Sequence, residues 1–219
     1  MVFGRKDRRG EPPVEPIEWR GVREFGVGKV ERPATPRRNR IGWGPNAVRV
    51  PRGDLLVPCA FIGPSSGASV ALFEDALFTR AVCVVSEPRE VDGARCYDVL
   101  DAAGSLVGTL WRVPPARRLR RHTWRIDQPD RPEITGRGEW SGIGAKGIAG
   151  RLAGKAFEGV VQSVLDLGAE GGDQPTKPRT LEWLAADELV MVSRGTDVRI
   201  HADWLDRRLA FAFAVVADN

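Results

Sequence analysis

The sequence lacks any long uninterrupted apolar run. Although 42% of its 219 residues are hydrophobic, no window reaches the roughly eighteen uncharged apolar residues that a membrane-spanning helix needs. The opening stretch MVFGRKDRRGEPP is charged and proline-rich without an apolar core, so we expect no secretory signal. The length suits one sizeable domain or two small ones. We expect a cytoplasmic protein that is at most peripheral to a membrane.

Cysteine and histidine are both scarce. Cys59, Cys83 and Cys96 are an odd number at spacings that fit neither a zinc site nor a disulfide framework. We interpret them as reduced, partly buried thiols. A pairing of a cysteine with His122 or His201 could form a nucleophile, but no glycine-framed nucleophile motif surrounds any cysteine. We therefore expect no enzyme, no metal site and no cofactor.

The positive charge is almost entirely arginine. The net charge is +4 and lysine is rare, and this usage, rich also in alanine and glycine, is typical of a GC-rich bacterial genome. Arginine number alone is therefore a poor indicator of nucleic-acid binding. The glycine-rich stretch GRGEWSGIGAKGIAG matches neither common phosphate-binding pattern. Nucleic acid is not an expected partner.

The N-terminal region, residues 1–53, is rich in proline and contains the run RPATPRRNR. Its apolar residues occur singly, without a sustained period. This pattern predicts a basic tail or a belt on the surface, mostly without regular structure. Trp19 and Trp43 would dock it in places, and the region could bind a partner protein.

Residues 54–219 have the pattern of an antiparallel β domain. LLVPCAFI and ALFTRAVCVVSEP are short apolar runs that end at proline or glycine. Turns at 101–104 and 128–132 each join two predicted strands, which indicates hairpins. Residues 143–172 interrupt the strands with a glycine-rich helical or loop insertion. It could pack across an open end of the domain, or lie on a membrane as a basic amphipathic helix.

The stretch LAFAFAVVA, at 209–217, contains no polar side chain. Its alternation of bulky residues with alanine also fits a strand, but the alanine content favours a helix over 203–217. Asp203 would cap this helix, with Asp206 in its first turn. A helix that is apolar on all sides must be enclosed. The sequence thus predicts a mainly β fold: a closed antiparallel β-barrel around a hydrophobic C-terminal α-helix.

Three segments, in order, resemble the tubby C-terminal-like superfamily, which includes phospholipid scramblases and the plant LURP-one-related proteins. YDVLDAAGSLVG (97–108) resembles the family hairpin, RHTWRID (121–127) the strand after it, and DRRLAFAFAVVAD (206–218) the closing helix. The resemblance covers about residues 70 to 219. It implies a barrel around the helix and, for some members, lipid binding. No acidic calcium loop matches that of the scramblases, so their activity is not implied here.

The densest cationic cluster is PARRLRRH. Its candidate site residues are Arg117, Arg118, Arg120, Arg121 and His122. Several guanidiniums together can bind phosphate, which points to an anionic lipid headgroup or a membrane surface. The run also fits a solvated barrel rim, neutralised by acidic neighbours such as Asp127 and Asp130. We expect a non-enzymatic binding protein; the alternative is a structural scaffold that docks a partner through residues 1–53.

Overall fold

The computed structural model describes residues 14–32, 42–65, 67–114, 122–138 and 178–217, without the side chains of residues 42 and 43. The first five strands are β1 (Glu24–Arg32), β2 (Gly42–Arg52), β3 (Leu55–Gly63), β4 (Val70–Phe73) and β5 (Ala81–Val85). The next five are β6 (Arg89–Val91), β7 (Ala94–Leu100), β8 (Leu106–Val113), β9 (Thr123–Asp127) and β10 (Ile134–Gly138). They are followed by β11 (Thr180–Ala185), β12 (Glu188–Arg194), β13 (Asp197–Ile200) and the helix α2 (Arg207–Val216).

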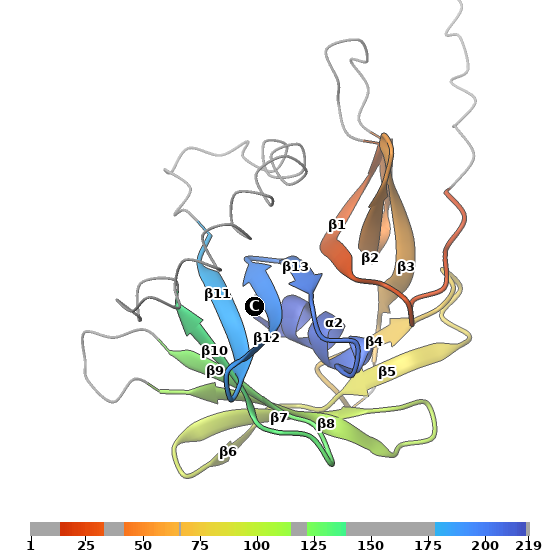
Figure 1. Ribbon diagram of the computed structural model, residues 1–219. Coiled ribbons are helices and arrows are strands. Elements are labelled where there is room, and N and C mark those ends of the chain that lie inside the picture. Colours follow the sequence, from red (N-terminus) through yellow and green to blue (C-terminus); the bar gives the residue numbers. More distant parts are fainter. Residues whose placement is uncertain (1–13, 33–41, 66, 115–121, 139–177, 218–219) are drawn as a thin grey trace, which may run out of the picture.

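The strands form a closed antiparallel barrel, as the sequence predicted (Figure 1). The sheet order runs β5-β4-β3-β2-β1-β13-β12-β11-β10-β9-β8-β7-β6, and an additional pairing of β5 with β7 closes it into twelve strands. The short β6 pairs with β7 beside this closure. Closure gives every barrel strand a partner on both sides over at least part of its length, which limits edge-to-edge association.

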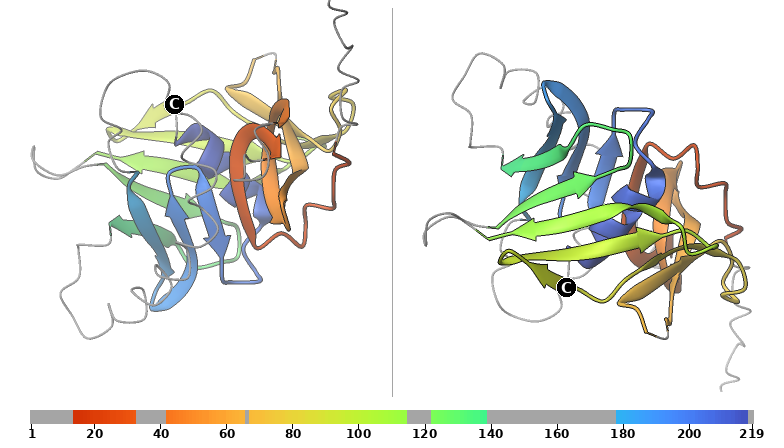
Figure 2. Two further views of the ribbon diagram at one scale, coloured as in Figure 1. Left: turned by 90° about the horizontal axis from the view of Figure 1, so that it is seen from above. Right: turned by 90° about the horizontal axis from the view of Figure 1, so that it is seen from below.

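Two short ladders join the halves of the barrel, β1 to β5 and β7 to β13. The β1–β13 ladder registers two residue pairs, Glu24 with Arg199 and Phe25 with Val198. The β5–β7 ladder also registers two, Val84 with Leu100 and Val85 with Val99. We call these ladders the two seams of the barrel. Helix α2 packs against strands from both seams, namely β1 and β13, and β5 and β7, as well as β8 (Figure 2).

Aromatic side chains connect α2 to the sheet. Phe211 meets Phe25 of β1 edge to face, with ring centroids 4.8 Å apart. Phe213 meets Trp183 of β11 at 4.5 Å and Trp124 of β9 at 5.4 Å in the same manner. Residues Leu209–Val216 are all buried. The prediction of a helix, rather than a strand, is therefore confirmed for this stretch.

The predicted start of this helix is wrong. Its N-cap is Asp206, whose carboxylate accepts a hydrogen bond from the backbone N of Arg208 at 2.9 Å. Asp203 is exposed and pairs with Arg23 instead. A cap residue must lie directly before the first helical turn, and Asp206 alone meets this condition because the helix begins at Arg207. No helix in the described part of the chain is long and apolar enough to cross a bilayer.

Both predicted hairpin turns are confirmed. Asp101 closes the β7–β8 turn, because its carboxylate accepts from the backbone N of Ala103 at 2.9 Å and of Ser105 at 2.8 Å. In the β9–β10 turn, the backbone N of Arg131 donates to the carbonyl of Gln128 at 3.2 Å. The side chain of Gln128 also accepts from the backbone N of Asp206 at 3.0 Å. This turn therefore holds the start of α2 in place.

The expectation that residues 1–53 lack regular structure is wrong over β1 and β2. Phe25 and Val27 alternate with Gly26 and Gly28, which is a strand period that the small, weakly β-forming glycines conceal. The β2 segment carries Pro45 at a break in the β1–β2 register, where the ladder needs no donor. Trp19 docks the preceding irregular segment as predicted. Residues 1–13, 33–41 and the 143–172 insertion lie outside the described residues.

Candidate binding surface at the β4–β5 loop

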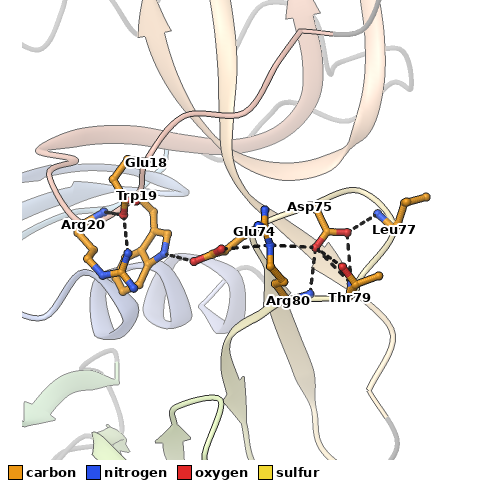
Figure 3. Close-up of polar contacts among 8 residues, drawn as sticks. All are labelled: Glu18, Trp19, Arg20, Glu74, Asp75, Leu77, Thr79 and Arg80. Carbon is orange, nitrogen blue, oxygen red and sulfur yellow. Dashed lines mark hydrogen bonds and ion pairs between the residues drawn. The ribbon is translucent and has the colours of Figure 1, made fainter.

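The loop between β4 and β5, residues 74–80, is held by one carboxylate (Figure 3). Asp75 accepts hydrogen bonds from the backbone N of Leu77 at 2.9 Å and of Arg80 at 2.9 Å, and from the hydroxyl of Thr79 at 2.9 Å. Partial desolvation raises the pKa of Asp75, but these hydrogen bonds outweigh it and hold the pKa below its ordinary value. The backbone N of Glu74 donates to the carbonyl of Arg80 at 2.8 Å, which joins the two ends of the loop. The loop is therefore a fixed turn.

The tip of this loop presents apolar side chains. Leu77 is 83% exposed and Phe78 is 37% exposed. Phe78 has a φ of 59°, a left-handed conformation that is unfavourable for a bulky residue. Its ring packs on Phe73 with centroids 5.2 Å apart. A Cβ on Gly63 would lie 2.6 Å from Phe78 Cδ1 and 2.7 Å from Phe73 Cε2, so glycine is needed beneath the two rings.

Trp19 ties the loop to the N-terminal segment and to α2. Its indole Nε1 donates to Glu74 Oε1 at 3.2 Å (Figure 3). The guanidinium carbons of Arg20 and Arg208 lie 4.5 Å and 5.7 Å from its ring centroid. The Trp19 ring also meets Phe211 of α2 edge to face at 6.5 Å. Trp19 thus links the exposed tip of the loop to the hydrophobic core.

The exposed charge beside the tip comes from the guanidiniums of Arg80 and Arg20 and from the carboxylate of Glu18, whose side chain is 63% exposed. Arg80 is 70% exposed at its side chain, whereas its partners Glu74 and Asp75, at 3.4 Å and 3.9 Å, are mostly buried. Arg20 is also exposed and pairs with Glu18 at 3.0 Å. The carboxylates of Glu74 and Asp75 are engaged by hydrogen bonds from Trp19 and from the loop backbone, and by ion pairs with Arg80. The arrangement suits contact with a surface that is both apolar and anionic.

The arginine run predicted from the sequence is placed only at its last residue. Arg117, Arg118, Arg120 and Arg121 lie outside the described residues. His122 is exposed, and its backbone carbonyl accepts a hydrogen bond from Arg179 Nη1 at 2.6 Å. Asp127, one of the acidic neighbours considered for this run, pairs with Arg125 at 3.1 Å. The role of the run as an anion site therefore stays a prediction.

Two further arginines, which precede that run in the sequence, escaped the sequence analysis. Arg95 and Arg112 are direct partners across β7 and β8. Neither guanidinium has an ion pair or a side-chain hydrogen bond with another residue of the described ranges. Like charges in direct cross-strand pairs oppose one another, and an anion between them would relieve this. Counting outward from the Asp101 turn would have paired Arg95 with Trp111 instead, because a register shift between Val99 and Leu100 moves the partner by one residue.

The cysteines do not form a reactive site. Cys59, Cys83 and Cys96 are free and buried. Burial raises the pKa of Cys59 and of Cys83 to about 12, so both remain protonated thiols. His201 is exposed, and partial burial with the nearby Arg199 lowers its pKa. Within the described ranges, no three metal-binding side chains come together.

The β4–β5 loop was also missed by the sequence analysis. ALFTRAVCVV was interpreted as one strand, but β5 begins only at Ala81 and the first part of the run is the loop. The informative signal was Asp75, because an aspartate followed closely by threonine can accept from the next backbone N–H groups and close a turn. Apolar residues directly after such a turn residue need not lie in a strand.

No protein-family model, curated protein or solved structure matches this chain.

Proposed function

We propose that this protein is a non-enzymatic binding protein for anionic lipid surfaces, peripheral to the membrane, with a tubby-like barrel that encloses α2. The order of a β7–β8 hairpin, a following strand and a last apolar helix supports the fold relationship. So does the burial of Leu209–Val216 against strands from both seams. Fold alone is a weak argument for function, so the lipid proposal needs an observation at the surface.

That observation is the rigid apolar tip of the β4–β5 loop. Leu77 is held outward by the bonds to Asp75, and Arg80 lies beside it with most of its side chain in solvent. Burying one leucine is worth about 1.5–3 kcal/mol. An arginine near an anionic membrane adds about 1 kcal/mol. Such a contact gives reversible, salt-sensitive association rather than permanent anchoring.

The predicted arginine run would be a second and separate contact. Strand β5 is antiparallel to β7, and β7 is antiparallel to β8. The start of β5 and the end of β8 therefore lie at opposite ends of the barrel. The β4–β5 loop precedes β5, whereas the segment with Arg117 to Arg121 follows β8. Variants at the two positions test two different membrane-facing surfaces.

The test is co-sedimentation with neutral and with phosphatidylserine-containing vesicles, at low and at physiological salt. We expect the wild-type protein to bind the anionic vesicles, more strongly at low salt. Leu77→Ser should weaken this binding about tenfold or more, since the free energy gained by burying the leucine side chain is lost. Leu106→Ser is the comparison variant: Leu106 is also an exposed leucine, at 53%, and lies at the same end of the barrel, but at the start of β8 rather than in the loop.

Each result separates the possibilities. An equal loss in both leucine variants would indicate unspecific apolar adsorption and would contradict the loop contact. Replacing Arg117, Arg118, Arg120 and Arg121 by glutamine tests the arginine run in the same assay. Absence of vesicle binding at either salt would overturn the lipid proposal. It would leave the scaffold alternative, which predicts a stable protein partner captured through residues 1–53.

A further inference from the structure

The seam between β1 and β13 is where the N-terminal strands join the C-terminal ones. Besides its two registered pairs, the backbone N of Ile200 donates to the carbonyl of Arg23 at 2.7 Å. On the side chains, Arg199 Nη2 pairs with Glu24 Oε2 at 3.1 Å across the same two strands. With so few bonds, this seam is one of the two weakest joints in the barrel wall.

A buried carboxyl group lies at one end of this seam. Asp197, the first residue of β13, is 6% exposed. Its Oδ2 is buried and has no hydrogen-bond partner in the described part of the chain. Its Oδ1 lies over the backbone of Gly26, where an added Cβ would be 2.5 Å from it. The carboxyl group therefore occupies the space that a side chain on β1 would need.

The charges around Asp197 come from three strands. Burial raises its pKa to about 6; Arg194 of β12 opposes this shift, and Glu24 of β1 adds to it. On β13 itself, Arg199 is engaged with Glu24. Arg194 is the cross-strand partner of Asp197. Arg194 makes no ion pair with Asp197 in the described part of the chain. The ionised carboxylate thus feels the charge of Arg194 but forms no ion pair with it.

We infer that Asp197 makes the β1–β13 seam a proton-sensitive joint, closed while its carboxyl group is neutral and loosened when that group ionises. This inference does not rest on lipid binding. When the seam opens, water reaches the carboxyl group and its pKa returns towards the ordinary aspartate value of about 3.9. Protonation therefore favours the closed seam. Opening becomes easier as the pH rises towards and through 6, by about tenfold between pH 5 and pH 7.

Opening would uncover the interior of the barrel. Phe25, next to Gly26, packs its ring on Phe211 of α2, and Val22 accepts a hydrogen bond from Arg207 at the start of α2. These contacts depend on β1 lying beside β13. The joint therefore couples proton concentration to the exposure of an apolar helix face, which gives the barrel wall an entrance that responds to pH.

Hydrogen exchange of the wild-type protein tests this directly. The amide of Ile200 reports the seam, because it donates to Arg23. After correction for intrinsic exchange, its protection should fall about tenfold from pH 5 to pH 7. Amides of the β5–β7 seam, such as that of Ser86, which donates to Asp98 at 2.9 Å, should not follow this change. An equal fall in both seams would overturn the inference, since it would indicate global destabilisation.

Two variants complete the test. Asp197→Asn should abolish the pH dependence at Ile200, because the amide side chain does not ionise. Asp130→Asn is the matched control: Asp130 is exposed in the β9–β10 turn, and its φ of 60° suits asparagine. If Asp197→Asn does not fold, the carboxyl resonance of Asp197 in the wild-type protein decides. Titration near pH 6 is expected, and titration near pH 4 would refute the joint.

Discussion

Arg207 Nε donates a hydrogen bond to the backbone carbonyl of Val22 at 2.8 Å, across 185 residues of sequence. The same guanidinium donates to the carbonyls of Leu205 and Ala202. A buried cation at the start of a helix is unfavourable unless all its donors are used, and burial lowers the pKa of Arg207. Here the guanidinium of Arg207 uses its donors on backbone carbonyls and links the N-terminal segment to α2.

Replacing this arginine should destabilise the protein strongly. Arg207→Met keeps the length of the side chain but leaves the carbonyls of Val22 and Leu205 buried without donors. We expect the free energy of unfolding to fall by about 2–4 kcal/mol. Urea denaturation measures this. Arg23→Met, at an exposed arginine with a surface ion pair, is the control and should change stability by less than about 1 kcal/mol.

Gly63→Ala should displace the rings that support the tip of the β4–β5 loop. The new methyl group would overlap with the edges of Phe73 and Phe78. Overpacking of this kind costs about 1–3 kcal/mol. The variant should unfold at lower urea concentration and bind anionic vesicles less well. In Gly28→Ala the new methyl group meets no atom within 4 Å, so vesicle binding should be unchanged. An equal loss of vesicle binding in this control would argue against the loop as the lipid-binding surface.

Phe211→Asp should prevent stable folding. Phe211 is fully buried between Phe25 and Trp19. A carboxylate there has no partner, and its burial costs several kcal/mol. Thermal unfolding with a solubility measurement is the assay. Phe211→Leu should be tolerated with a smaller loss, and an unchanged melting temperature in Phe211→Asp would contradict the buried position of α2.

Asp197→Asn should stabilise the protein at neutral pH. Because the folded-state pKa of Asp197 is raised to about 6, ionisation penalises the folded state above that pH. A shift of about two units corresponds to at most about 3 kcal/mol at pH 7.5. The penalty shrinks as the pH falls through 6 and vanishes near 4. Urea denaturation should show a gain for the variant at pH 7.5 that falls to about half at pH 5; an equal gain at both would contradict the assignment.

Asp206→Ala should weaken α2 by about 1 kcal/mol, the usual contribution of an N-cap. Its carboxylate bonds the backbone N of Arg208 and pairs with the side chain of the same residue at 2.6 Å. Asp203→Ala should have little effect on helix stability, although the sequence alone favoured it as the cap. Chemical denaturation of the two variants side by side distinguishes the assignments.

The elements that the sequence predicted correctly are those whose structure depends on residues close together in the chain. The Asp101 turn was predictable because its hydrogen bonds join residues two and four positions apart. The helix at Leu209 was predictable because alanine favours helices independently of context. The strand around Phe25 was not, because glycines separate its apolar residues and its partners come from β13 and β2. Pairing between distant segments leaves no local pattern.

The binding surfaces were less predictable than the fold. The arginine run at Arg117 was visible because its residues are neighbours in sequence. Arg95 and Arg112 come together only through the β7–β8 register. The exposure of Leu77 depends on a carboxylate and on a glycine from another strand. Asp197 has an unremarkable sequence context, and only the closure of the barrel places it over Gly26 and away from water.

The β1–β13 seam also determines when the molecule can be completed during synthesis. Glu24 and its partner Arg199 are separated by 175 positions, so β1 leaves the ribosome long before β13 exists. Until then, Phe25 has neither its neighbouring strand nor the ring of Phe211 to pack against. Closure is therefore a late event in synthesis, and it is slowed by the large loop it must close. A nascent chain halted before α2 would hold an open sheet, and chaperones that recognise exposed apolar strands would bind it for as long as the stall lasts.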